Sequence, residues 1–186
     1  MSMIALEALP LSRQQIRDFS TQIRKAVQMD DHPFMDVQSL IDFILPKIMP
    51  GFYYDVRSIQ EMGEKHGEAA PSEGRISIRA DVFDGMVAGV GRDRFTVAHE
   101  ISHLLLHTPD RIVLNRRGGT PPPFRDPEWQ ANCLAGELLA HHKFINQYST
   151  VHEMARKAGI SLPAAKVQWN AYEKDKLIGG GVRKAN

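Results

Sequence analysis

The chain has 186 residues, of which 42% are hydrophobic and 24% are charged, and its formal net charge at pH 7 is +1. These values are typical of one globular domain with a substantial core, and they exclude the strong basic field that attracts nucleic acid or an anionic membrane. The single Cys133 excludes an internal disulfide. With no signal-peptide pattern and no apolar run near the about 20 residues that span a bilayer, we expect a cytoplasmic protein without a membrane partner.

Helices are expected first in the chain. Ser12-x-x-Gln15 forms a capping box, which predicts a helix that ends near Val27 or Met29. Asp36 is a second N-cap candidate, and the apolar residues after it recur at helical spacing until Pro46, where we expect the helix to stop. We interpret both helices as scaffold.

A small sheet is predicted after these helices. Residues 52–56 are aromatic and β-branched and indicate a short strand. Residues 67–74 indicate a loop. The run 75–80 alternates in polarity with a period of two, which predicts a half-buried strand with Ile76 and Ile78 inward. The glycine-rich segment that follows predicts a loose link to the next helix.

The most informative stretch is 94–107, which contains the pattern H-E-x-x-H from His99 to His103. On a helix of about 3.6 residues per turn, these two histidines lie on the same face, so both imidazoles can bind one ion, and Glu100 projects beside them. A catalytic zinc site usually has three protein ligands and leaves a fourth position to water. The pattern therefore supplies two ligands and a base, and a third ligand must come from elsewhere.

The remaining chain predicts one long loop and three helices. Segment 108–127 indicates an irregular loop, for which two interpretations stay open: a rim or lid of the site, or a surface loop without a role. Pro127 is placed to begin a helix over about 128–140. Further helices are expected at 151–158 and 161–172.

Glu128 is the favoured third ligand. His107 is excluded because the helix climbs about 12 Å between His99 and His107, whereas zinc lies about 2 Å from a ligand nitrogen; we interpret it as a helix C-terminal histidine. Glu128 and Glu137 are nine residues apart, so they point in opposite directions and only one can face the metal. Asn132, one turn after Glu128, could hydrogen-bond a metal-bound imidazole and hold its tautomer. Glu137 would then be structural.

Two parts of the mechanism are less determined. The oxyanion stabiliser stays open among Tyr148, Tyr172, His141 and His142, which are all chemically able. The strand around 76–80 could pair with an extended substrate by strand addition, which would align the scissile bond with the ion.

The block 94–107, followed by Glu128-x-x-Ala131-Asn132 and Glu137-Leu138-Leu139, resembles the ImmA/IrrE metallo-endopeptidase family. The resemblance extends more weakly over most of the chain. It implies an α+β, mostly helical zincin-like metalloprotease domain, with a small β-sheet beside the helix that carries the H-E-x-x-H motif.

The resemblance also implies roles for residues and partners. His99, His103 and Glu128 would bind Zn²⁺, Glu100 would be the catalytic base, and Asn132 would back a zinc-bound histidine. The protein would be a zinc-dependent regulatory endopeptidase that acts on a helix-turn-helix repressor or antitoxin-like partner, in stress response and transcription regulation.

The predicted organisation is a single domain, with the following parts: 1–178 as the metallopeptidase domain, 1–35 as an N-terminal helical extension, 108–127 as a loop, 151–173 as a C-terminal helical hairpin, and 179–186 as a flexible tail. The alternative function is a DNA-binding or protein-binding regulator with a non-proteolytic metal site. It rests on Ala155-x-x-x-Gly159, which stands at helix-turn-helix spacing before the N-cap Ser161. Because Gln168 falls where an apolar packing residue is wanted and the chain is nearly neutral, direct nucleic-acid binding is not expected.

Overall fold

A computed structural model describes residues 5–115 and 120–178 of the chain, so the predicted tail 179–186 lies outside the described residues. The fold is mostly helical, with a three-stranded and a two-stranded sheet, and this confirms the mostly helical α+β class. The α-helices are α1 (Arg13–Ala26), α2 (Val37–Ser39), α3 (Leu45–Ile48), α4 (Ile59–Met62), α5 (Ala80–Val87), α6 (Gly91–Leu106), α7 (Pro127–Leu139), α8 (Val151–Ala158) and α9 (Leu162–Lys174). The strands are β1 (Ala5–Ala8), β2 (Tyr53–Arg57), β3 (Gly67–Ala70), β4 (Arg75–Arg79) and β5 (Ile112–Asn115).

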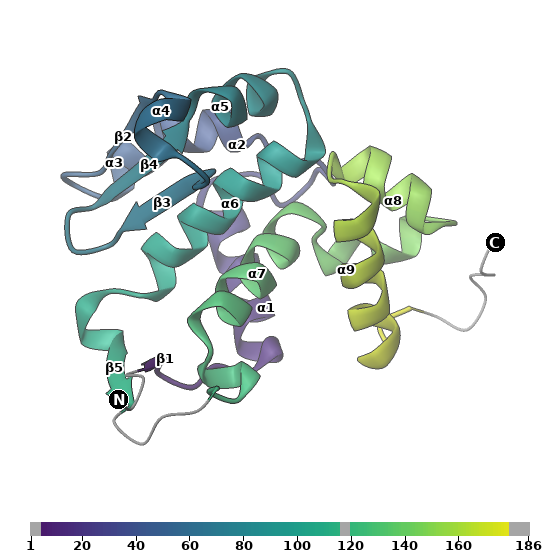
Figure 1. Cartoon of the computed structure of the whole chain (residues 1–186). Coiled ribbons are helices and arrows are strands. Elements are labelled where there is room, and N and C mark those ends of the chain that lie inside the picture. Colours follow the sequence, from purple (N-terminus) through teal and green to yellow (C-terminus); the bar gives the residue numbers. More distant parts are fainter. Residues whose placement is uncertain (1–4, 116–119, 179–186) are drawn as a thin grey trace.

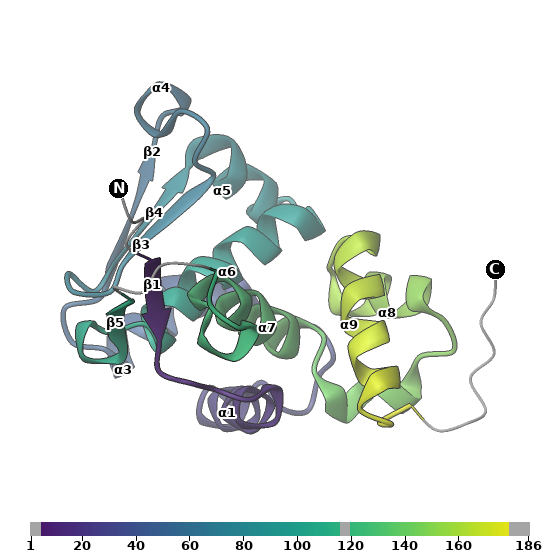
Figure 2. The same ribbon diagram turned by 60° about the horizontal axis from the view of Figure 1, so that its bottom comes forward.

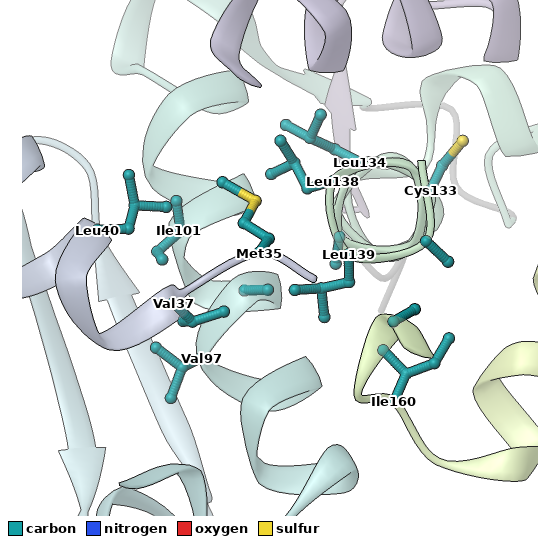
Figure 3. Packing of buried hydrophobic residues seen from close by; sticks show 14 of the residues in the cluster. Met35, Val37, Leu40, Val97, Ile101, Cys133, Leu134, Leu138, Leu139 and Ile160 are labelled. Atoms are coloured by element: carbon teal, nitrogen blue, oxygen red, sulfur yellow. The ribbon is translucent and has the colours of Figure 1, made fainter. Parts of the chain in front are cut away.

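Helices α6 and α7 form the centre of the molecule (Figure 1). The three-stranded sheet lies on one side of α6, α8 and α9 lie beyond the other end of the pair, and α1 packs against α7 (Figure 2). Between α6 and α7, Met35 fills the space beside Ile101 of the one helix and Leu138 and Leu139 of the other (Figure 3). These four side chains are at most 1% exposed, so the two helices that carry the motif residues are joined by a dry core. In the described part of the chain, no helix is both long and apolar enough to cross a bilayer.

The sheet has the order β2-β4-β3, with β2 parallel and β3 antiparallel to β4. Strand β4 confirms the prediction for 75–80, with Ile76 and Ile78 fully buried. Segment 67–74 was predicted as a loop, and this was wrong, because its first residues form the edge strand β3. The small residues Gly67, Ala69 and Ala70 carry no β-branched or aromatic side chain, so only pairing with β4 reveals the strand.

Of the first two predicted helices, one is confirmed and the other extends beyond its predicted end. The capping box of α1 is confirmed, since Ser12 and Gln15 exchange both capping hydrogen bonds. Asp36 also caps a helix, but the helix does not stop at Pro46. It widens into a π-helical turn (η1, Leu40–Ile44) and continues to Ile48, because this wider turn accommodates a residue that has no N–H to donate.

Two regions that were predicted to be irregular contain regular structure. The expected loose link before the motif helix is α5, whose Gly85 lies inside the helix. The expected loop 108–127 contains β5, which pairs with β1 from the start of the chain. Helices α8 and α9 confirm the two helices predicted near the C-terminus, and Ser161 caps α9 as expected.

Candidate metal centre

The motif residues converge at the face where α6 and α7 meet. Nε2 of His99 and Nε2 of His103 are 3.0 Å apart, and each lies 3.3 Å from a different carboxylate oxygen of Glu128. Within the described residues, these three side chains form the group able to hold a metal ion, with ligand atoms within 4.8 Å of one another. Ligand atoms around a tetrahedral zinc lie about 3.3 Å apart, because each is about 2 Å from the ion. The three residues therefore fit a zinc ion.

Local structure explains why Glu128 reaches the two histidines. Asp126 accepts a hydrogen bond from the backbone N–H of Glu128, and Pro127 occupies the first turn, so α7 begins just before the carboxylate. A carboxylate in the first turn is favoured by the helix dipole. Arg94 anchors the other helix, since its buried guanidinium donates to the carbonyls of Ala158, Gly159 and Met35.

The electrostatics of the site favour neutral histidines. Burial lowers the pKa of His99, although the Glu128 carboxylate and hydrogen bonds with Asn132 and Glu128 oppose this effect. Burial and the neighbouring His99 lower the pKa of His103 to about 4. Burial raises the pKa of Glu100 to about 7, and the charge of Glu128 acts in the same direction. Two neutral imidazoles are the form that binds a metal.

Glu100 is held against the edge strand β3. The backbone of Ala69 hydrogen-bonds its carboxylate. A Cβ added to Gly67 would lie 2.7 Å from Cγ of Glu100, so only glycine lets the strand approach this closely. The position of the carboxylate is therefore set by the strand that sequence reasoning missed.

We expect Gly67→Ala to displace the Glu100 side chain while the fold is kept. The three atoms nearest to the added Cβ all belong to the Glu100 side chain, beginning with Cγ at 2.7 Å, so this side chain must change its rotamer. A small error in the placement of a catalytic group lowers turnover by up to about 100-fold. Peptide hydrolysis should therefore fall while zinc content and thermal unfolding stay near those of the wild type. Ala70→Gly is the matched control on the same strand. Wild-type turnover in Gly67→Ala would contradict the proposal that Gly67 sets the position of the Glu100 carboxylate.

Each histidine of the cluster has a polar partner behind it. Asn132 hydrogen-bonds His99, and this contact agrees with its predicted backing role. Nδ1 of His103 lies 2.9 Å from Nδ1 of His107, and Nε2 of His107 lies 3.2 Å from Oε1 of Gln130. His107 is thus not merely a histidine at a helix end. Sequence reasoning missed Gln130, although its spacing of two residues from Glu128 was visible.

Three candidates for the oxyanion stabiliser, Tyr148, Tyr172 and His141, are buried, and His142 is partly buried. The hydroxyl of Tyr172 donates to Glu137 and to the carbonyl of Ala140, and His141 lies 3.0 Å from Thr21. Tyr148 is 1% exposed. The described residues that line the cleft over the cluster include none of these candidates. The lining consists of Lys65, Gly67, Glu68, Ala69, Pro71, His99, Glu100, His103, His107, Ile112, Thr120, Pro121, Asp126, Pro127 and Glu128.

The cleft over the cluster has a volume of about 700 Å³ and two walls. Strand β3 forms one wall, and the described part of 108–127 contributes to the other through Ile112, Thr120 and Pro121. The described part of this segment therefore borders the cleft.

Residues 88–170 match the family model Peptidase_M78, described as the IrrE N-terminal-like domain, and this range contains α6, α7 and α8 completely. No curated protein matches the chain.

Proposed function

The chain belongs to the ImmA/IrrE family of metallopeptidases, and from this premise we propose that it is a zinc-dependent endopeptidase that cleaves a regulatory protein. The observation that carries the proposal is the convergence of His99, His103 and Glu128 beside a buried Glu100 in one cleft. Two imidazoles, one carboxylate and a nearby carboxylate base are the donor set that zinc peptidases use.

Glu100 would move the proton during hydrolysis. A zinc ion bound at the cluster would polarise the scissile carbonyl and make water acidic enough to lose a proton near neutral pH. The carboxylate of Glu100 would take a proton from the attacking water and return it to the nitrogen of the leaving amine. A base with a pKa near the working pH does both well, and burial brings Glu100 to about 7.

The substrate would bind as an extended segment along β3. This corrects the strand-addition prediction for 76–80, because β4 pairs on both sides and has no free edge. The carbonyl of His66 accepts from Arg79 across the sheet, so the backbone groups of Gly67 and Ala69 point away from β4. The backbone of Ala69 already hydrogen-bonds Glu100, so an added strand would pair through the remaining backbone groups of this edge. An added strand pairs through main-chain hydrogen bonds, which favours a locally unfolded segment as substrate.

The proposed partner is a helix-turn-helix repressor or antitoxin-like protein, so that cleavage would act on transcription, for example in a stress response. The resemblance of the motif blocks to the ImmA/IrrE family supports this partner. The start of α9 does not favour the DNA-binding alternative, since Pro163, Ala164 and Val167 line a groove of about 400 Å³ together with Phe95 and Trp129.

Mass spectrometry of a candidate repressor, incubated with the protein and zinc, tests this function. We expect discrete cleavage products that disappear with a chelator and return when zinc is restored. Duplex DNA binding should be weak and should not depend on zinc. Full zinc occupancy without cleavage of any candidate repressor would contradict the peptidase and favour a non-proteolytic regulator.

A further inference from the structure

Two buried side chains stand behind His103, on the side away from Glu128. His107 is 6% exposed and Gln130 is fully buried, and hydrogen-bonding contacts run from Nδ1 of His103 through His107 to Gln130. We propose that His107 and Gln130 are positioning residues that fix the imidazole tautomer of His103, so that its Nε2 faces the metal site with a free lone pair. This inference rests on the metal site of the proposed function and extends it.

The orientation of the Gln130 amide is determined by its other contacts. Its Nε2 donates to the carbonyls of Leu9 and Phe124, each at 2.9 Å, which uses both N–H groups. A flipped amide would turn its oxygen toward two carbonyl oxygens and lose both bonds. Oε1 therefore faces His107. Because an amide oxygen can only accept, Nε2 of His107 must carry a hydrogen.

The proton on His103 follows from this. A neutral His107 with its hydrogen on Nε2 has a free lone pair on Nδ1. The contact of 2.9 Å between the two Nδ1 atoms then requires the hydrogen to sit on His103, which leaves Nε2 of His103 unprotonated. The reverse arrangement would need a doubly protonated His107, a buried cation whose two hydrogen-bond partners are a neutral amide and an imidazole.

The free lone pair points at the other ligands. Nε2 of His103 is the atom that lies 3.0 Å from Nε2 of His99 and 3.3 Å from Glu128. The two histidines are supported differently, since His99 has the exposed Asn132 behind it whereas His103 has two buried groups. Gln130 is in turn held by the chain before α1 and by the turn before α7, so the tautomer depends on contacts distant in sequence.

Zinc affinity measured by competition with a chromophoric chelator tests the inference without any peptide cleavage. His107→Phe keeps the ring size but removes the acceptor, and we expect zinc binding about 10–100-fold weaker. His107→Asn keeps an acceptor near the position of Nδ1 and should bind zinc more tightly than His107→Phe. His141→Phe is the matched control, because His141 is also buried but contacts Thr21. Its affinity should be that of the wild type.

Nitrogen-15 NMR of the metal-free wild type gives a second measurement that needs no variant. We expect His103 to carry its hydrogen on Nδ1, with Nε2 showing the shift of an unprotonated nitrogen. Hydrogen on Nε2, or equal zinc affinity in wild type and folded His107→Phe, would overturn the inference and leave the peptidase standing. A wild type that binds zinc without cleaving protein would overturn the peptidase alone.

Discussion

Glu100→Gln is expected to lower peptide hydrolysis by about 10²–10⁴-fold, which is the usual contribution of a general base. The amide has nearly the same shape but cannot accept the proton of the attacking water. Because Glu100 is not among the three grouped ligand side chains, zinc should stay bound. The measurements are turnover of a cleaved repressor and zinc content by atomic emission.

The matched control for Glu100→Gln is Glu64→Gln. Glu64 is exposed and is not among the residues that line the cleft, so the substitution makes the same chemical change away from the proposed base and the proposed substrate strand. We expect this variant to cleave at nearly the wild-type rate. Glu100→Gln that still cleaves at a wild-type rate would end the mechanism, whatever its zinc content.

The second large effect is expected at Glu128, where substitution by Ala should remove the metal. A complete zinc site contributes about 10–16 kcal/mol over its ligands, so the loss of one ligand costs several kcal/mol, or at least about 10²-fold in affinity. Glu128 is 68% exposed in its side chain, so truncation should leave thermal unfolding of the metal-free protein unchanged. Dialysis against a zinc buffer followed by metal analysis measures the loss.

Glu137→Ala separates a ligand from a structural carboxylate on the same helix. Glu137 is fully buried and accepts hydrogen bonds from Arg17 and Tyr172 at 3.0 and 2.8 Å. Its removal leaves the buried guanidinium of Arg17 with Asp175 as its remaining carboxylate partner, so the cost in unfolding free energy should lie near the lower end of the about 3–5 kcal/mol of a broken buried pair. We expect a lower melting temperature with normal zinc content in the folded fraction. If Glu137→Ala lost zinc and Glu128→Ala kept it, Glu137 would be the metal ligand and Glu128 the structural carboxylate.

The site residues could be predicted from local spacing because helices place side chains by simple rules. His99 and His103 share a face at a spacing of four residues, and Glu128 and Glu137 had to diverge on one helix. The structure does bring the first three together and buries the fourth among α1 and α9 residues. The capping residues Ser12, Asp36 and Ser161 were equally visible, since each bonds within its own first turn.

Strand β3 shows what local reasoning could not supply. Its residues Gly67, Ala69 and Ala70 have little strand preference of their own, and the neighbouring β4 provides the pairing. Strands β1 and β5 pair across more than half of the chain, so their pairing also depends on distant contacts. The proposed substrate wall was therefore assigned to β4, where alternation was clear but both edges are occupied.

By itself the sequence determined the helices that carry His99, His103 and Glu128, the shared face of the two histidines and the nearly neutral charge, because these depend on side-chain chemistry and on contacts within about one or two helical turns. Only the tertiary structure decided which strand borders the cleft, how Ala69 and Gly67 place Glu100, and that His107 and Gln130 stand behind His103. These arrangements depend on hydrogen bonds and close approaches between segments far apart in the chain, and no local pattern of residues encodes such distances.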